Sequence, residues 1–320
     1  MTFISTSEKK YYSIGFYNLE NLYDTENDPN TLDDDFTDDS DKNWNEDRLQ
    51  KKVYKLGKII SQLGYEDVSH SPVIVGVAEV ENSSVLDDLI SSKYLKSKGY
   101  SYAHFDSPDE RGIDNALLFR EEYFKVLEKH THTLMLQTPE GQRDYTRDIL
   151  HVKGSLDGNV IHILVNHWPS RRSGNDETVY KRVAAANKNR EIMGTILLEE
   201  PDAKILIMGD FNDDPTSKSI VTLKGDDLYN PMEQLLTRDE GTLNYHGNWN
   251  LFDQVLMTNN FLKPHDNPLR YEKSSIYNPI ELQEYSGKYK GNPFRTYAGD
   301  RYLGGYSDHF PVYEVFSVRK

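Results

Sequence analysis

The sequence predicts an α/β protein, because strand-like and helix-like runs alternate irregularly along its 320 residues. Nine runs have the apolar or alternating pattern of strands, and three place apolar residues at helical spacing. The strict strand–helix repeat of a doubly wound sheet is missing. No internal repeat and no linker rich in Pro, Gly and Ser divides the chain, so we expect one domain over residues 1–320, with the acidic stretch 24–47 as an inserted loop.

The predicted strands share β-branched and aromatic residues bounded by turn formers. They are Tyr11–Tyr17, Val73–Ala78, Tyr102–Phe105, Asn115–Arg120, Ile149–Gly154, Val160–Asn166, Lys204–Met208, Leu251–Thr258 and Pro311–Phe316. Helices are predicted at about 46–62, 84–94 and 177–199. The last has the clearest apolar face, made of Val179, Val183, Ala186, Met193 and Leu197.

Composition limits the possible chemistry. Apolar residues make up only 37%, but aromatic residues reach 12%, which is enough to build a core. The chain has no cysteine, which excludes disulfides, thiolate zinc sites and cysteine nucleophiles. No apolar run approaches membrane length, and Met1–Lys10 lacks the apolar core of a signal peptide. We therefore expect no membrane span, and a cytoplasmic protein unless a leader has been removed.

Charge is unevenly distributed. The net charge of −15 counts against nucleic acid as a partner, because phosphate contacts supply most of such affinity. Residues 24–47 hold eleven acidic side chains against the single Lys42. The segment Tyr285–Tyr306 is basic instead, with five tyrosines among four cations, which suits a single strand or simply a packed hairpin. Nucleic acid and a small phosphoester therefore both stay open as substrates.

Two short motifs indicate phosphate chemistry. Gly209-Asp210-Phe211-Asn212 follows the apolar run Ile205–Met208, and Ser307-Asp308-His309 precedes the last strand. Carboxylate and carboxamide oxygens bind hard divalent cations, a carboxylate can act as a base for water, and an imidazole can act on a phosphoryl group. The two motifs together predict hydrolysis of a phosphate ester.

Further candidates lie at strand ends. Asn18 and Glu20 follow the first strand and could line a metal site, or could form a strand-ending turn. Glu79 leaves the all-apolar run Val73–Ala78, and strand exits of α/β sheets are where ligands bind. His167 ends a strand beside Arg171 and Arg172, a grouping suited to an oxyanion, although each arginine taken alone is expected to be a solvated loop charge.

Two aspartates are candidates for orienting an imidazole. Asp253 lies inside an apolar strand, where a carboxylate needs a partner, and His309 is the expected one; the alternative is a backbone hydrogen bond at a bulge. Asp114 could form an ion pair with Arg111, or could orient His167.

Taken in order, Asn18, Glu79, His167, Asp210 with Asn212, and Asp308 with His309 resemble the endonuclease/exonuclease/phosphatase superfamily, which has the fold of pancreatic deoxyribonuclease. The phrases Phe16–Leu22 and Asn166–Arg171 are similar to a bacterial, nuclease-like branch. The resemblance implies a four-layered α/β/β/α sandwich with two mixed sheets packed face to face. It also implies one or two Mg²⁺ or Mn²⁺ ions, with Ca²⁺ possible, in a protein expected to be a monomer.

The resemblance also implies a role for each residue. Glu79 would be the principal metal ligand, with Asn18, Glu20 and Asp308 near the ion. Asp210 would orient or deprotonate the attacking water, and Asn212 would hold a phosphate oxygen. His309, polarised by Asp253, would act on the scissile phosphate, and Asp114 would support His167.

The family leaves the substrate open. The sequence favours a nuclease of low sequence specificity, and the alternative is a phosphatase or phosphodiesterase for a small molecule or lipid headgroup. A binding module without activity is disfavoured, because every expected catalytic position is filled.

Overall fold

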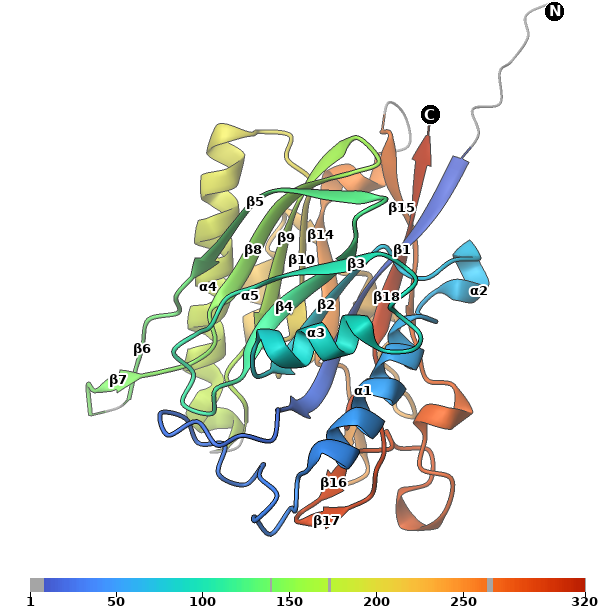
Figure 1. Ribbon diagram of the computed structural model, residues 1–320. Helices are drawn as coiled ribbons and strands as arrows, with labels where there is room; N and C mark the ends of the chain where they lie inside the picture. Colours follow the sequence, from blue (N-terminus) through green and yellow to red (C-terminus); the bar gives the residue numbers. More distant parts are fainter. Residues whose placement is uncertain (1–8, 139, 172–173, 264–266, 320) are drawn as a thin grey trace, which may run out of the picture.

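The computed structural model describes residues 9–138, 140–171, 174–263 and 267–319. Most of the polar N-terminus and Arg172, about which the sequence made predictions, lie outside these ranges. Two six-stranded mixed sheets lie face to face, and helices cover their outer faces (Figure 1). The predicted α/β/β/α sandwich is confirmed.

The first sheet carries both ends of the described chain. Its strands, in spatial order, are β15 (Leu269–Ile276), β18 (Val312–Arg319), β1 (Lys9–Leu22), β2 (Ile74–Val80), β4 (Asp114–Arg120) and β3 (Tyr100–His104). Only β1 and β2 are parallel neighbours, and the other pairs are antiparallel.

The second sheet is built from the middle of the chain. Its order is β11 (Leu228–Tyr229), β14 (Asp253–Thr258), β10 (Ile205–Asp210), β9 (Asn159–His167), β8 (Ile149–Leu156) and β5 (Phe124–His132). Here β9 and β10 are the parallel pair. The parallel pair of each sheet therefore ends with its carboxyl termini side by side.

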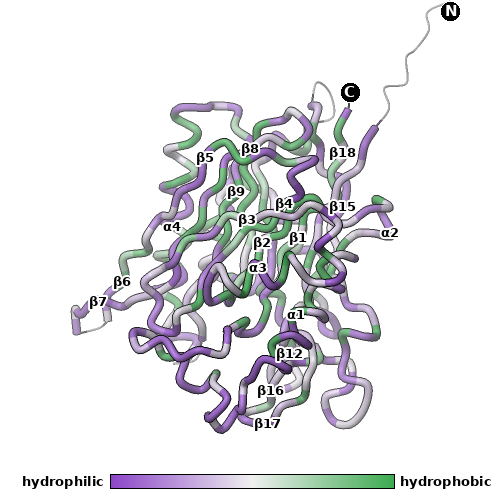
Figure 2. Tube along the Cα trace, in the orientation of Figure 1, coloured by the Kyte–Doolittle hydropathy of each residue, from purple (hydrophilic) through white to green (hydrophobic). Residues whose placement is uncertain are grey.

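The core between the sheets follows the two-residue period of the strands. Along the central parts of β1, β9, β10 and β14, every second residue points into it and is fully buried, as in Phe16, Val165, Met208 and Val255. Figure 2 shows hydrophobic residues among the strands at the centre of the molecule and hydrophilic ones on the outlying loop with β7. This alternation decides which residue of each strand end faces the space between the sheets.

Helices form the two outer layers. Both α1 (Glu46–Ile60) and α3 (Ser83–Ser91) cover the first sheet, and α4 (Asn175–Glu199) and α5 (Lys218–Lys224) cover the second (Figure 1). A single turn, α2 (Tyr65–Val68), follows α1. The buried face of α4 differs from the predicted one, because it includes the polar residues Arg182 and Asn189 while Val179 and Val183 are only half-buried.

Short elements complete the chain. Three two-stranded hairpins pair β6 (Leu136–Gln137) with β7 (Arg143–Asp144), β12 (Leu243–Tyr245) with β13 (Asn248–Asn250), and β16 (Tyr297–Ala298) with β17 (Arg301–Tyr302). The 3₁₀ turns are η1 (Pro231–Gln234), η2 (Asn259–Leu262), η3 (Ile280–Leu282) and η4 (Gly287–Tyr289). Among the described residues, no helix combines the length and the apolar character needed to cross a membrane.

Candidate active site

Polar side chains occupy the last inward position of several core strands. Asn18 continues the row of Phe16, His167 that of Val165, and Asp210 that of Met208, while Asp253 stands at the start of the antiparallel β14. In the second sheet, Asp210 is paired in register with both His167 and Asp253. The two sheets therefore bring these side chains together at one end of the sandwich, as the sequence predicted.

Asp210 lies at the centre of this group. Its Oδ2 accepts a hydrogen bond of 3.0 Å from Asn18 Nδ2 across the two sheets. The same oxygen lies 3.7 Å from His167 Nε2 and 3.8 Å from His309 Nε2. Its Oδ1 accepts from the backbone N–H of Asn212 at 2.9 Å. Burial raises the pKa of Asp210 to about 6, although His309 opposes the shift, so at neutral pH the carboxylate is mostly ionised and can accept a proton.

The predicted pairing of Asp253 with His309 is confirmed. His309 Nδ1 lies 2.7 Å from Asp253 Oδ2, and both side chains are buried. Burial alone would lower the pKa of His309, but the carboxylates of Asp253 and Asp210 outweigh it and hold the pKa well above the usual value. His309 is therefore an imidazolium at neutral pH, with Nε2 directed toward Asp210.

His167, in contrast to His309, is neutral at neutral pH. Burial lowers its pKa well below the usual range, and the nearby guanidinium groups of Arg147 and Arg111 add to the effect. Its Nε2 lies 3.8 Å from Glu79 Oε1, and its Nδ1 is buried without a hydrogen-bond partner among the described residues. The site thus holds one neutral and one charged imidazole.

Glu79 is fixed by its own backbone and by β1. Its φ is +62°, a left-handed conformation that interrupts the pairing of β2 with β1 and β4. Its Oε2 accepts from the backbone N–H of Asn21 at 2.9 Å, and Oε1 lies 3.9 Å from Arg111 Nη1. One carboxylate oxygen is thereby left facing His167 and the site.

Asp114 does not support His167, so this prediction was wrong. Asp114 Oδ2 lies 3.1 Å from His104 Nε2, and Oδ1 accepts from the backbone of Ser107. It does not pair with Arg111 either, because Arg111 contacts Asn21 and Glu79. The inward residue of this strand end is Asn115, which shares a row with Leu117 and has a buried Oδ1 without a partner among the described residues.

The structure gives Glu20 a second role. Its carboxylate accepts hydrogen bonds from the backbone N–H of Thr296 at 2.6 Å and of Tyr297 at 3.4 Å, so it anchors the loop before β16. Burial raises the pKa of Glu20 to about 7, and the charge of Asp308 adds to the shift. Arg295 from the same loop binds Asp308 Oδ2 at 2.9 Å. A ligand role for Glu20 stays a prediction.

Arg171 holds the loop after β10 in place, so it is not the solvated loop charge that was expected for each arginine taken alone. Its Nε donates to the backbone carbonyl of Asn212 at 2.7 Å, and its Nη2 pairs with Asp213 at 2.6 Å. The buried Arg182 of α4 binds the other oxygen of Asp213 at 2.8 Å. Asn212, with a φ of +49°, donates one N–H to the carbonyl of Trp168 at 3.0 Å, and its other amide N–H has no partner among the described residues.

The oxygen-rich donors suit a hard divalent cation. Asp308 is one-third exposed, Glu79 Oε1 faces the site, and a buried oxygen of Asp253 has no hydrogen-bond partner within the described ranges. Asp210, Asp253 and His309 also lie close enough together to hold an ion, although the Asp253–His309 pairing already engages the imidazole. Glu79, Asp308 and Asn18 are the residues that would bind Mg²⁺ or Mn²⁺; these ligand assignments stay predictions.

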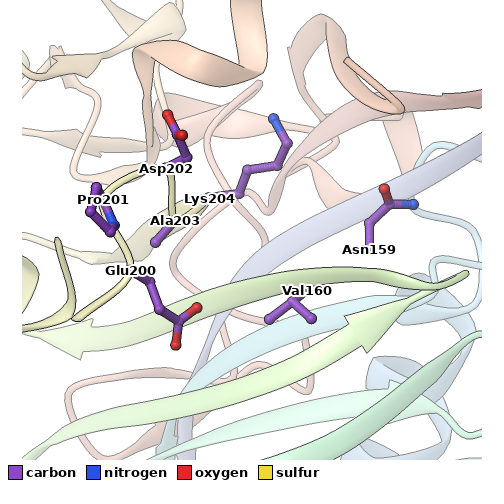
Figure 3. A pocket seen from close by; sticks show the side chains of 7 residues that line it. All are labelled: Asn159, Val160, Glu200, Pro201, Asp202, Ala203 and Lys204. Atoms are coloured by element: carbon purple, nitrogen blue, oxygen red, sulfur yellow. The ribbon is translucent and has the colours of Figure 1, made fainter. Parts of the chain in front are cut away.

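One hollow of about 400 Å³ lies far from this group. It is lined by residues at the start of β9 and in the turn before β10, among them Asn159, Glu200 and Lys204 (Figure 3). The active-site residues His167 and Asp210 stand at the other ends of these same strands. This hollow is therefore no part of the candidate active site.

The family follows from a comparison with known proteins. Residues 13–319 match the model of the Endonuclease/Exonuclease/phosphatase family, so the chain belongs to that family. The family consists of divalent-metal-dependent phosphoester hydrolases, and this protein is an enzyme of that class. Among curated proteins, none matches the sequence.

Solved structures share the fold at low sequence identity. An endonuclease/exonuclease/phosphatase family protein from Bacteroides thetaiotaomicron is 17% identical with a TM-score of 0.61, over 98% of this chain and 97% of that one. A mannosyl-6-phosphatase from the same organism is 18% identical with a TM-score of 0.59, over 95% and 98%. D. rerio TDP2 in complex with a single-strand DNA product is 16% identical with a TM-score of 0.56, over 96% and 98%.

Proposed function

We propose that this enzyme hydrolyses the phosphoester of a small polar molecule. The observation that carries the proposal is the position of the acidic stretch 24–47, which packs against the β16–β17 hairpin, the start of which is held by the Glu20 carboxylate. Tyr23 stacks on Phe36, and Trp44 packs against Tyr297 of the β16–β17 hairpin. Lys42 binds Asp35 of the loop and Asp300 of the hairpin, so the cation of this stretch is already neutralised. A polyanion approaching here would be repelled.

The basic segment Tyr285–Tyr306 does not offer a continuous track for phosphates. Arg295 is paired with Asp308 and Glu20. Tyr297 is buried, and Tyr302 and Tyr306 pack against the core under the helices of the first sheet. These tyrosines stabilise the loop and do not present their faces to bases. Both features favour a substrate with few negative charges.

The residues of the site divide the chemistry between them. A bound divalent cation polarises a phosphoryl oxygen and lowers the pKa of water. Asp210, ionised and fixed by Asn18 and by the Asn212 backbone, accepts a proton as the water oxygen attacks phosphorus; the bond from phosphorus to the ester oxygen breaks, and the leaving alcohol takes its proton from solvent. The imidazolium of His309 donates a hydrogen bond to the phosphoryl group, and Asp253 stabilises its charge. The free N–H of Asn212 orients a phosphoryl oxygen.

The comparisons support both kinds of substrate. The mannosyl-6-phosphatase shows that this fold can serve a sugar phosphate, and the TDP2 complex shows that it can hold single-stranded DNA. A nuclease of low specificity is therefore the second candidate. It is favoured by Tyr285 and Tyr289, which are 77% and 59% exposed, with the Lys288 ammonium 5.4 Å from the Tyr289 ring.

A substrate panel tests the proposal. The purified protein with Mg²⁺ or Mn²⁺ is assayed against p-nitrophenyl phosphate, bis-p-nitrophenyl phosphate, sugar phosphates, single-stranded DNA, RNA and plasmid at several salt concentrations. We expect kcat/KM to be higher for small esters and nearly independent of salt.

Faster cleavage of a polynucleotide, with a steep salt dependence that flattens when Lys288, Lys290 and Arg301 are neutralised, would establish the nuclease instead. Arg295 is left unchanged in that variant, because its ion pairs with Glu20 and Asp308 contribute to the site itself.

A further inference from the structure

A polar groove lies between the two loop regions that lead to Asp253 and to His309. It has a volume of about 420 Å³, within the range of small-molecule sites. Three segments form it: the loop after η1 with Asp239 and Glu240, Trp249 of β13, and the stretch from Asn278 to Asn292. We propose that this groove binds a sugar unit of a phosphorylated carbohydrate substrate, an inference that rests on the proposed function.

The groove is connected to the active site through Trp249. The Trp249 ring lies 6.0 Å from that of Phe310, at an angle of only 21°, and Phe310 directly follows His309. The backbone N–H of Phe310 also bonds to the carbonyl of Thr242, whose hydroxyl accepts from the backbone N–H of Asp253 at 3.3 Å. At the other side, Asn292 is three residues before Arg295, which binds Asp308. The segments that form the groove thus run directly into Asp253 and into Asp308 and His309, and this continuity is the reason for placing the rest of a substrate bound at His309 in the groove.

The walls of the groove are held in place before any ligand binds. Asn278 Nδ2 donates to Glu240 Oε1 at 3.0 Å, and Gln283 Nε2 donates to the Asn278 carbonyl at 2.7 Å. The backbones of Glu284 and Asn292 are joined at 2.8 Å. Such preorganisation lowers the entropy lost on binding.

The remaining polar groups match sugar hydroxyls. Within the described part of the chain, the Asn292 amide, Gln283 Oε1, the Asp239 carboxylate and the Lys290 ammonium line the groove without a side-chain hydrogen bond of their own. Hydroxyls both donate and accept, so they can satisfy carboxylates, amides and an ammonium together. The half-buried indole supplies a flat apolar face for the C–H side of a sugar ring.

Charge distinguishes this ligand from a nucleic acid. Two carboxylates and one ammonium line the groove, which leaves it slightly negative. A strand of nucleotides would bring further phosphates next to Asp239 and Glu240 and would be repelled. A neutral sugar unit carries no such penalty.

The test compares substrates that differ in the group attached to phosphate. For wild type, Trp249→Ala, Asn292→Ala and the control Tyr245→Ala, kcat/KM is measured with trehalose 6-phosphate, mannose 6-phosphate and p-nitrophenyl phosphate. Tyr245 lies on the same hairpin, is 67% exposed and does not line the groove. We expect the ratio of kcat/KM for sugar phosphate over aryl phosphate to fall at least tenfold in the two groove variants, through KM, and to be unchanged in Tyr245→Ala.

A second measurement separates this proposal from the proposed function. Trehalose without phosphate and a single-stranded oligonucleotide are titrated into wild type and into both groove variants, with Trp fluorescence or NMR shifts as the readout. Binding of trehalose that Trp249→Ala abolishes would support the groove even if no small phosphoester were hydrolysed, an outcome that would refute the proposed function alone. An unchanged substrate ratio, or oligonucleotide binding in place of trehalose binding, would overturn the sugar groove.

Discussion

His309 Nδ1 and Asp253 Oδ2 lie 2.7 Å apart and join the loop before β18 of one sheet to the first residue of β14 in the other. The pair is buried, and Asp210 approaches the opposite ring nitrogen of His309 at 3.8 Å. An imidazole held between two carboxylates keeps its proton and one orientation. This relationship fixes the charge of the group that acts on the phosphate.

Replacing Asp253 by Asn should lower kcat/KM by roughly 10²–10⁴, the range for loss of acid–base assistance or its orientation. Since the carboxylate raises the pKa of His309, its removal lowers that pKa, and the alkaline limb of the pH–rate profile should shift to lower pH. The control Asp157→Asn removes a carboxylate that binds Tyr12 and Lys10 near the start of β1. A profile of Asp253→Asn that overlays wild type would disprove the role.

Glu79 should determine the affinity for the metal. We expect Glu79→Gln to raise the Mg²⁺ concentration for half-maximal rate at least tenfold, because it removes a charged oxygen ligand. The matched control is Glu81→Gln, since Glu81 accepts a backbone hydrogen bond from Asp24 and forms no ion pair within the described residues. Equal Mg²⁺ dependence of the two variants would exclude Glu79 as a ligand.

The period of the strands explains which of the predicted site residues the structure brings together. Asn18, His167 and Asp210 each continue an inward row of apolar residues that is visible in the sequence. The same alternation, applied to the predicted strand Asn115–Arg120, places Asn115 on the inward face with Leu117. Asp114 then lies on the other face, so the pattern itself argues against the predicted contact of Asp114 with His167. The left-handed backbone of Glu79 and the anchoring of Thr296 by Glu20 depend on long-range packing that no local pattern reveals.

Three strands of the two large sheets, β5, β11 and β15, were not predicted from the sequence, and their omission has a physical cause as well. Both β5 and β15 are edge strands, and most of their side chains are exposed or half-buried. Without a buried face on each side they lack the apolar runs by which the central strands were recognised.

Glu314 should make stability depend on pH. It is fully buried in β18, with one oxygen bonded to Ser274 and the other unpaired in the described structure, and burial raises its pKa well above the usual value. Below pH 4.5 the Glu314 carboxyl is neutral in the folded and in the unfolded protein, and its burial then costs no ionisation energy. Above that pH only the unfolded state ionises, so the free energy of unfolding falls until the pH reaches the folded-state pKa. Glu314→Gln should therefore gain stability over wild type by up to about 1.4 kcal/mol per pH unit above 4.5.

Chemical denaturation at pH 5 to 8 measures this gain, with Glu272→Gln on the exposed part of β15 as the control. A difference between Glu314→Gln and wild type that does not change with pH would show that Glu314 is ionised in the folded protein.

Three neighbouring histidines on the second sheet should have the opposite effect on stability, because they destabilise the folded protein as the pH falls. His151 bonds to His162 at 3.0 Å and lies 3.4 Å from His132, and His162 lies 3.4 Å from Glu200. Burial and the neighbouring imidazoles lower the pKa of His151 to about 3. The unfolded chain then binds more protons below pH 6.5, so stability falls as the pH falls from 6.5 toward 3.

His151→Asn should flatten the decrease of unfolding free energy between pH 7 and 5, whatever its effect at pH 7. The exposed His246→Asn serves as the matched substitution and should keep the wild-type slope. Identical slopes for wild type and both variants would mean that His151 titrates normally in the folded state.

The most direct test of the catalytic centre is the rate of small-phosphoester hydrolysis by wild type and Asp210→Asn, with and without a chelator. Asp210→Asn keeps the size of the side chain but removes the base, and Asp226→Asn in the turn after α5 is its control. We predict that chelation abolishes the wild-type rate, that Mg²⁺ or Mn²⁺ restores it, and that Asp210→Asn loses at least about 10³-fold in kcat with an unchanged melting temperature. A wild-type rate that survives chelation, or an Asp210→Asn variant as fast as Asp226→Asn, would contradict this account.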